Sequence, residues 1–108
     1  MTTAPEIHVN DNAELHRFEI TVDGHLAGFA EYAFRPRTIA FVHTEIDDEY
    51  AGRGLGSVLA RVALDSARHR GLDVLPFCPF IRDWIRRHPA YLDLVPSTRR
   101  RSFELDAK

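Results

Sequence analysis

Three alternating glycines constrain the fold of this 108-residue chain more than any other feature. Gly52, Gly54 and Gly56 stand between an apolar run that ends at Ile46 and a helical pattern that begins at Leu55. Glycine allows positive φ and lets a ligand approach the main chain, because it has no Cβ. A strand, a glycine loop and a helix in this order present backbone N–H groups to an anion. We therefore predict that the loop binds the diphosphate of a cofactor; the alternative is a turn that only joins strand to helix.

The residues before the loop predict an antiparallel meander. Apolar and polar residues alternate between Leu15 and Val22, which is typical of a half-buried strand. Asp23-Gly24 is a strong hairpin signal, and Asn10, Asp11 and Asn12 predict an earlier turn. The predicted strands cover residues 6–9, 15–22, 25–34 and 38–46.

After the loop the apolar residues recur at helical spacing from Leu55, and Gly71 predicts the end of this helix. A short apolar strand is predicted over residues 72–75, a second helix over 80–88, and a helical turn over 90–95. This order predicts an α/β (α+β) fold with a mixed, mainly antiparallel sheet and packed helices.

Length and composition predict one domain over residues 1–108, with 97–108 as a candidate flexible tail. A net charge of −2 argues against a dedicated nucleic-acid binder. The run Arg99–Arg101 is either solvated or a phosphate-contacting arm. Because there is one cysteine, no signal-like start and no long apolar run, we expect a cytoplasmic protein without a membrane partner.

Three phosphate-binding patterns compete for the glycine loop. A P-loop requires Lys after its last glycine, whereas Ser57 follows Gly56. A dinucleotide fingerprint requires G-x-G-x-x-G, and here Gly56 comes one residue too early; the chain is also too short for a double βαβ fold. The third pattern is an acyl-CoA loop of the form Q/R-x-x-G-x-G/A.

On this third pattern the chain resembles a known family. AGRGLGS after a strand, followed by SVLARVALDSARHRGLDV, is similar to the acetyl-CoA-binding core of the GNAT superfamily of N-acetyltransferases. The segments HTEI, PFCPF and HPAYLDLV resemble small single-domain GNAT-like proteins of the YjdJ type, over residues 14–95. Ala51 replaces the Q/R that opens the superfamily loop, which a cradle of backbone N–H groups does not require.

The resemblance implies a minimal GNAT fold, acetyl-CoA as cofactor, and a division of labour in binding it. Backbone N–H groups over 53–57 would hold the diphosphate, and Arg53 would add a charge-assisted contact. The main chain at Glu45 and Ile46 would pair with the pantetheine amides as an added strand. The implied cofactor-binding residues are Glu45, Ile46, Gly52, Arg53, Gly54, Leu55, Gly56 and Ser57.

Three residues are candidates for catalysis. Cys78 precedes Pro79, so it is predicted as the N-cap of the second helix, where the helix dipole favours thiolate. His43 and Glu45 are predicted to share a strand face with Ile39 and Phe41, and either could accept a proton. The alternatives are a small buried cysteine, a structural histidine and a solvated strand end.

Two chemistries follow for an N-acetyltransferase. A neutral amine attacks the thioester directly, or Cys78 is acetylated first with His43 as its base. The acceptor is an unidentified small-molecule or protein amine, and the protein acts as a monomer or weak homodimer. The alternative function is a non-catalytic acyl-CoA-binding module or interaction protein. Tyr91 is a further candidate, for protonating the departing thiolate, and no histidine spacing indicates a metal.

Overall fold

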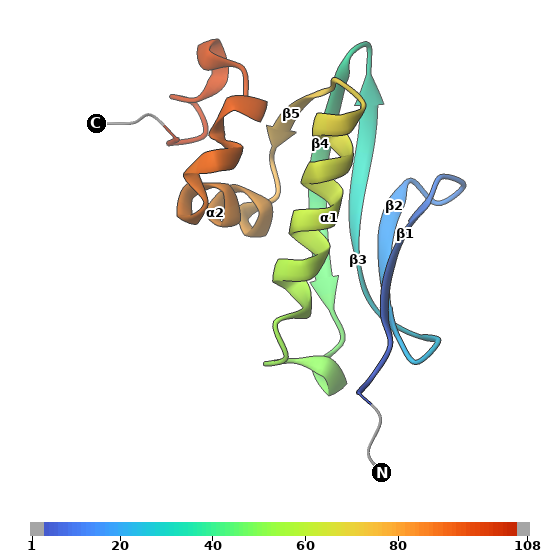
Figure 1. Ribbon diagram of the computed structural model, residues 1–108. Coiled ribbons are helices and arrows are strands. Elements are labelled where there is room, and N and C mark those ends of the chain that lie inside the picture. Colours follow the sequence, from blue (N-terminus) through green and yellow to red (C-terminus); the bar gives the residue numbers. More distant parts are fainter. Residues whose placement is uncertain (1–3, 106–108) are drawn as a thin grey trace.

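The computed structural model describes residues 4–105 and shows one twisted sheet with helix α1 lying along one of its faces (Figure 1). The strand order is β1-β2-β3-β4-β5, with β1 to β4 antiparallel and β5 parallel to β4. The strands are β1 (Ile7–Asn12), β2 (Arg17–Val22), β3 (His25–Arg35), β4 (Thr38–Ile46) and β5 (Asp73–Pro76). The predicted mixed, mainly antiparallel sheet is confirmed.

The two predicted helices and the predicted helical turn occur in the predicted order, and two further 3-10 helices were not predicted. The α-helices are α1 (Leu55–His69) and α2 (Pro79–Arg87), and the 3-10 helices are η1 (Asp48–Tyr50), η2 (Pro89–Leu94) and η3 (Ser97–Arg99). Helix α1 begins at the predicted residue and stops before Gly71, which has φ of 68°. Helix α2 lies beside α1 at the β5 end of the sheet (Figure 1). No helix in the described part of the chain is long and apolar enough to span a membrane.

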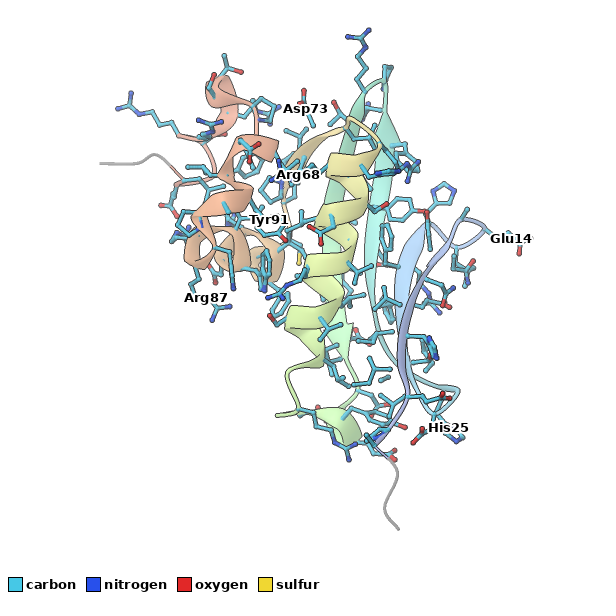
Figure 2. The ribbon with its side chains drawn as sticks, in the orientation of Figure 1. Glu14, His25, Arg68, Asp73, Arg87 and Tyr91 are labelled. Atoms are coloured by element: carbon cyan, nitrogen blue, oxygen red, sulfur yellow. The ribbon has the colours of Figure 1, made fainter. Side chains whose placement is uncertain are left out.

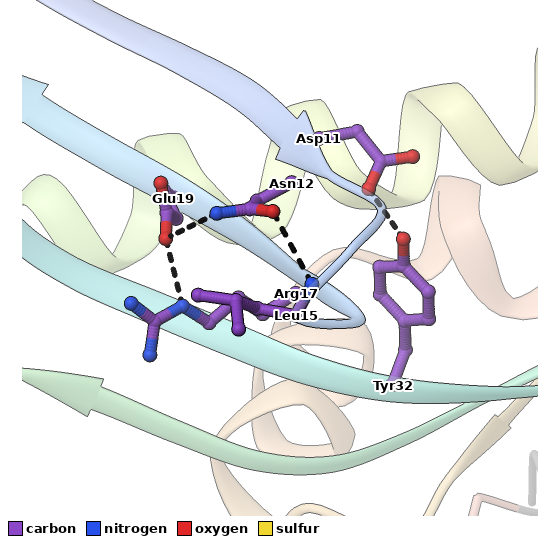
Figure 3. A network of polar contacts seen from close by, with 6 residues as sticks. All are labelled: Asp11, Asn12, Leu15, Arg17, Glu19 and Tyr32. Carbon is purple, nitrogen blue, oxygen red and sulfur yellow. Dashed lines mark hydrogen bonds and ion pairs between the residues drawn. The ribbon is translucent and has the colours of Figure 1, made fainter.

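Of the two turns predicted in the N-terminal part of the chain, one is confirmed and one is wrong. The Asp23-Gly24 turn is confirmed, with φ of 49° and 83° at its two residues. The turn predicted at residues 10–12 is wrong, because these residues extend β1, where Asn12 lies opposite Arg17. The chain instead turns at residues 13–16, and the Asn12 side chain accepts a hydrogen bond from the Leu15 N–H (3.2 Å, Figure 3).

A buried tyrosine ties β1 to β3 at this end of the sheet. The Tyr32 hydroxyl donates a hydrogen bond to Asp11 (Figure 3), although the ring is only 4% exposed. Burial, and next this hydrogen bond, raises the pKa of Tyr32 to about 12. Tyr32 lies opposite Phe41 of β4, so it also anchors the centre of the sheet.

The core lies between α1 and one face of the sheet. The predicted alternation in β2 is confirmed, because Phe18, Ile20 and Val22 are buried while the residues between them are half-exposed. Arg17 and Glu19 lie on the opposite face, where they form an ion pair of 2.8 Å.

The C-terminal segment packs on this core as far as it is described. Within the candidate tail over 97–108, Phe103 and Leu105 are each 4% exposed. Arg100 Nε donates to the Val95 carbonyl (2.9 Å), and the Arg99 guanidinium lies over the Phe103 ring. Residues 106–108 of the predicted tail lie outside the described residues.

Candidate functional site

A β-bulge in β4 determines which of its side chains face α1 and which lie on the opposite face of the sheet. Phe41 lies opposite Tyr32, and His43 lies opposite Glu31, so Val42 has no partner in β3. A bulge of one residue reverses the alternation of side chains beyond it, because strand side chains alternate with a period of two. The two halves of β4 therefore present opposite sets of residues to α1.

The prediction that His43 and Glu45 share a face with Ile39 and Phe41 is wrong for this reason. Ile39 and Phe41 are buried on the α1 side, at 1% and 0% exposure. The side chains of His43 and Glu45 lie on the opposite face and are 53% and 61% exposed. The bulge therefore takes these two polar groups out of the core.

His43 and Glu45 form a pair on this open face. His43 Nε2 lies 3.0 Å from Glu45 Oε1, so the imidazole donates to the carboxylate when Nε2 carries the proton. The Phe29 ring packs beside the imidazole, with 6.1 Å between ring centroids. Glu45 also lines an open pocket of about 410 Å³, together with Leu26, Ala27, Gly28, Phe29, Ile46, Asp47 and Asp48. The arrangement can accept a proton from a group that enters the pocket.

Cys78 lies on the other side of β4. It is the N-cap of α2, as predicted, but its side chain is only 3% exposed. Its Sγ donates to Thr44 Oγ1 at 3.3 Å, and its N–H donates to the Phe41 carbonyl at 2.8 Å. The structure therefore brings Cys78 together with Thr44, and it places the His43 side chain on the opposite face of the strand.

The glycine loop combines two different uses of glycine. Gly52 and Gly54 have φ of 79° and 75°, and a Cβ at either position would meet no atom within 4 Å. Gly56 has another role, since its Cβ would lie 2.7 Å from Cζ of Phe80. Gly54 is the N-cap of α1 and has no side chain to cap it, and no side chain among residues 4–105 caps the first N–H groups of the helix. The loop is thus an open cradle with uncapped donors.

The side chains around the loop support its shape. Ser57 Oγ accepts a hydrogen bond from Trp84 Nε1 (2.8 Å), which ties α1 to α2. The Arg53 guanidinium lies over the Tyr50 ring, 5.3 Å from its centroid. Because the Ser57 hydroxyl serves the packing of Trp84, the main-chain N–H is the group that Ser57 can offer to a ligand.

The edge of β4 is open next to this loop. Its ladder with β5 ends where Phe41 lies opposite Pro76. Beyond the Cys78 N–H bond to Phe41, no described strand pairs with β4 on this side as far as Ile46. A ligand held at the loop can therefore continue along an unpaired strand edge.

Tyr91, the candidate for protonating the departing thiolate, lies in η2 and contacts α1. Its hydroxyl donates to Asp65 of α1 (2.8 Å), which raises the pKa of Tyr91. The Arg68 guanidinium lies over the ring and binds Asp93, so these residues, labelled in part in Figure 2, join α1 to η2. Trp84 is 1% exposed and belongs to the core.

Sequence reasoning missed Thr44 as part of the site, and it missed the contact of Phe80 with Gly56. One sequence signal could have indicated that Thr44 faces the core. Under strict alternation His43 and Glu45 would be buried in its place, and burying such polar groups costs free energy. The change of apolar parity across Val42 indicates a bulge. No sequence signal pairs Phe80 with Gly56, because that contact depends on how α1 and α2 pack.

Comparison with known proteins agrees with the fold. A family model described as GCN5-related N-acetyl-transferase matches residues 17–94. Protein NATD1 from Mus musculus is 28% identical over 85 residues, covering 77% of each chain, and Protein NATD1 from Bos taurus is 29% identical over 92 residues, covering 80% of this chain and 81% of its own. A GCN5-like putative N-acetyltransferase from Staphylococcus aureus, solved by NMR, superposes with a TM-score of 0.62 at 25% identity, covering 83% of this chain and 86% of that one.

Proposed function

The chain belongs to the GCN5-related N-acetyltransferase family, and on this premise we propose that it transfers an acetyl group from acetyl-CoA to an amine. The observation that carries the proposal is the uncapped glycine loop at the start of α1, next to an unpaired edge of β4. The acceptor is an unidentified small-molecule or protein amine. We further propose that attack on the thioester is direct.

The loop fits the diphosphate of coenzyme A. Uncapped N–H groups and the positive end of a 15-residue helix favour an anion. The open space beside Gly52 and Gly54 is what a close main-chain approach requires. The N–H groups of residues 53–57 would hold the phosphates. Arg53 would reach them by leaving the Tyr50 ring or by sliding along it.

The open edge of β4 fits the pantetheine arm. Its amides would pair with the main chain near Glu45 and Ile46, as an extended peptide adds to a sheet edge. Acetyl-CoA would supply an acetyl thioester, whose carbonyl carbon would bond to the amine nitrogen while its bond to sulfur breaks and coenzyme A leaves as the thiolate. Since the arm would run from the loop towards the point where β4 and β5 separate, the reacting end would lie near the bulge at Val42.

The His43–Glu45 pair would receive the proton of the attacking amine. Both side chains are accessible, and Glu45 lines the pocket on the open face. A positioned base contributes on the order of 10²–10⁴-fold to proton transfer. Nδ1 of His43, whose Nε2–H donates to the carboxylate, or the carboxylate through a water molecule, would perform this step.

The position of Cys78 favours the direct route over an acetyl-Cys78 intermediate. A nucleophile needs access to the thioester and a base within hydrogen-bond reach. Cys78 is buried and donates to Thr44, while the His43 side chain faces away from it. Cys78 therefore has a packing role in this proposal.

A pair of glycine variants tests cofactor binding. Gly54 and Gly24 both have positive φ, at 75° and 83°, and a Cβ at either position would meet no atom within 4 Å, so Ala imposes a similar backbone strain at both sites. Only Gly54→Ala places a methyl group in the cradle. We expect Gly54→Ala to weaken CoA binding about 10-fold or more in calorimetry, as for loss of charged hydrogen bonds, and Gly24→Ala to leave it unchanged.

Two results would contradict the proposal at different levels. Absence of CoA binding by the unmodified protein would overturn it entirely. Binding of CoA without transfer to any amine in a broad screen would favour a non-catalytic CoA-binding module.

A further inference from the structure

A second pocket opens on the solvent side of α2. It has a volume of about 390 Å³ and is lined by Phe80, Asp83, Arg86 and Arg87. Phe80, Asp83 and Arg87 follow the i, i+3, i+7 spacing of one helical face. This face is separate from the buried side of the helix, which carries Trp84 and the isoleucines.

This pocket adjoins the start of α1 through one of its lining residues. The Phe80 ring that forms one wall packs directly against Gly56 in the first turn of α1. Phe80 and Arg87 are seven residues apart, or about 10 Å along the helix axis. Phe80 therefore lies between the first turn of α1 and the Arg87 end of the pocket.

The charges of the pocket leave one arginine available. Arg86 forms an ion pair with Asp83 and also donates to the Glu104 carbonyl (3.4 Å), so its charge is largely compensated. Arg87 is exposed, and no acidic side chain among residues 4–105 pairs with it. Figure 2 shows its side chain extending from α2 into solvent. The pocket thus offers a half-buried aromatic ring and one guanidinium with unused donors.

We propose that this face of α2 binds the adenosine 3′-phosphate end of coenzyme A, with the Phe80 ring against the adenine and Arg87 on the 3′-phosphate. The inference rests on the proposed function. The guanidinium fork matches the oxygens of a phosphate monoester. Aromatic side chains stack on nucleobases without needing hydrogen bonds. The site would discriminate coenzyme A from cofactors that end in a plain adenosine diphosphate.

The test compares two ligands that differ only in this phosphate. Calorimetry of the unmodified protein is expected to show CoA binding about 10-fold tighter than 3′-dephospho-CoA, the value of a charged hydrogen bond. In Arg87→Gln both ligands are expected to bind with the weaker affinity. Arg82→Gln removes the same charge from the same helix, but Arg82 does not line the pocket, so the preference should remain. The preference should also decrease as salt is added.

The outcomes separate this inference from the proposed function. Equal binding of CoA and 3′-dephospho-CoA by the unmodified protein overturns the subsite and leaves cofactor binding at the loop in place. A preference that survives Arg87→Gln, or is lost equally in Arg82→Gln, overturns the role of Arg87. If CoA does not bind at all, both proposals fail.

Discussion

The two halves of β4 are both extended strand, but they differ in their strand pairing and in the burial of their side chains. Over Thr38–Phe41 the strand is paired on both sides, with β3 and β5, and its side chains Ile39, Ala40 and Phe41 are buried. Over His43–Ile46 it is paired with β3 alone and exposes His43 and Glu45. The extra residue between them, Val42, marks the change. The difference teaches that one strand can serve as scaffold over one half and, by our proposal, as cofactor-binding edge and catalytic surface over the other.

The largest effect is expected in the paired half. Phe41→Ala removes a fully buried ring and should lower the free energy of unfolding by about 3–5 kcal/mol. Such a loss is a large fraction of the stability of a typical domain, about 5–15 kcal/mol. Urea unfolding followed by circular dichroism measures it. Val42→Ala is the matched control, because this neighbouring side chain is 48% exposed and should cost less than about 0.5 kcal/mol. Equal costs for both variants would mean that the two halves are not distinct.

The second-largest effect is expected from a substitution in the exposed half of β4, and it should lower the acetyl-transfer rate without changing the stability. Glu45→Gln should lower the rate of acetyl transfer about 100-fold at saturating acetyl-CoA, because the His43–Glu45 pair loses its charge. Its unfolding free energy should change by less than about 0.5 kcal/mol, since the side chain is solvated. Glu14→Gln removes the same charge from an exposed turn far from the loop (Figure 2) and should leave both quantities unchanged. A rate in Glu45→Gln equal to that of the Glu14 control would remove the pair from the mechanism.

The contrast within β4 also separates what the sequence could predict from what it could not. The bounds of β4, Thr38–Ile46, followed from its apolar run and from the break at Pro36, and the start of α1 followed from the helical period at Leu55. These are local patterns, and local patterns persist in the fold. The bulge at Val42 depends on the pairing with β3, and its one trace in the sequence is the change of apolar parity, so a strict alternation assigned His43 and Glu45 to the wrong face.

In the glycine loop, too, some features could be predicted from the sequence and others could not. Its position between strand and helix was predictable, and the positive φ of Gly52 and Gly54 fits the interpretation of a cradle. The reason for Gly56 was not predictable, because it depends on the contact between Phe80 of α2 and the first turn of α1. Residues that meet only through helix packing leave no spacing rule in the sequence, and the contact that joins the α2 pocket to the start of α1 belongs to this class.

The smallest effect is expected at Cys78, which contacts both halves of the strand through the Phe41 carbonyl and the Thr44 hydroxyl. Under direct attack, Cys78→Ala should change the transfer rate by less than about two-fold and cost about 1 kcal/mol of stability, a usual value for a point substitution. Thr44→Val keeps the thiol and removes its hydrogen-bond acceptor, so it should have a similarly small effect on the rate. Intact mass spectrometry after incubation with acetyl-CoA tests the alternative route, because it detects an acetyl group bound covalently to the protein. A stable acetyl adduct that disappears in Cys78→Ala, together with a large loss of transfer, would make the buried side of β4 the catalytic one and reverse the assignment of its two faces.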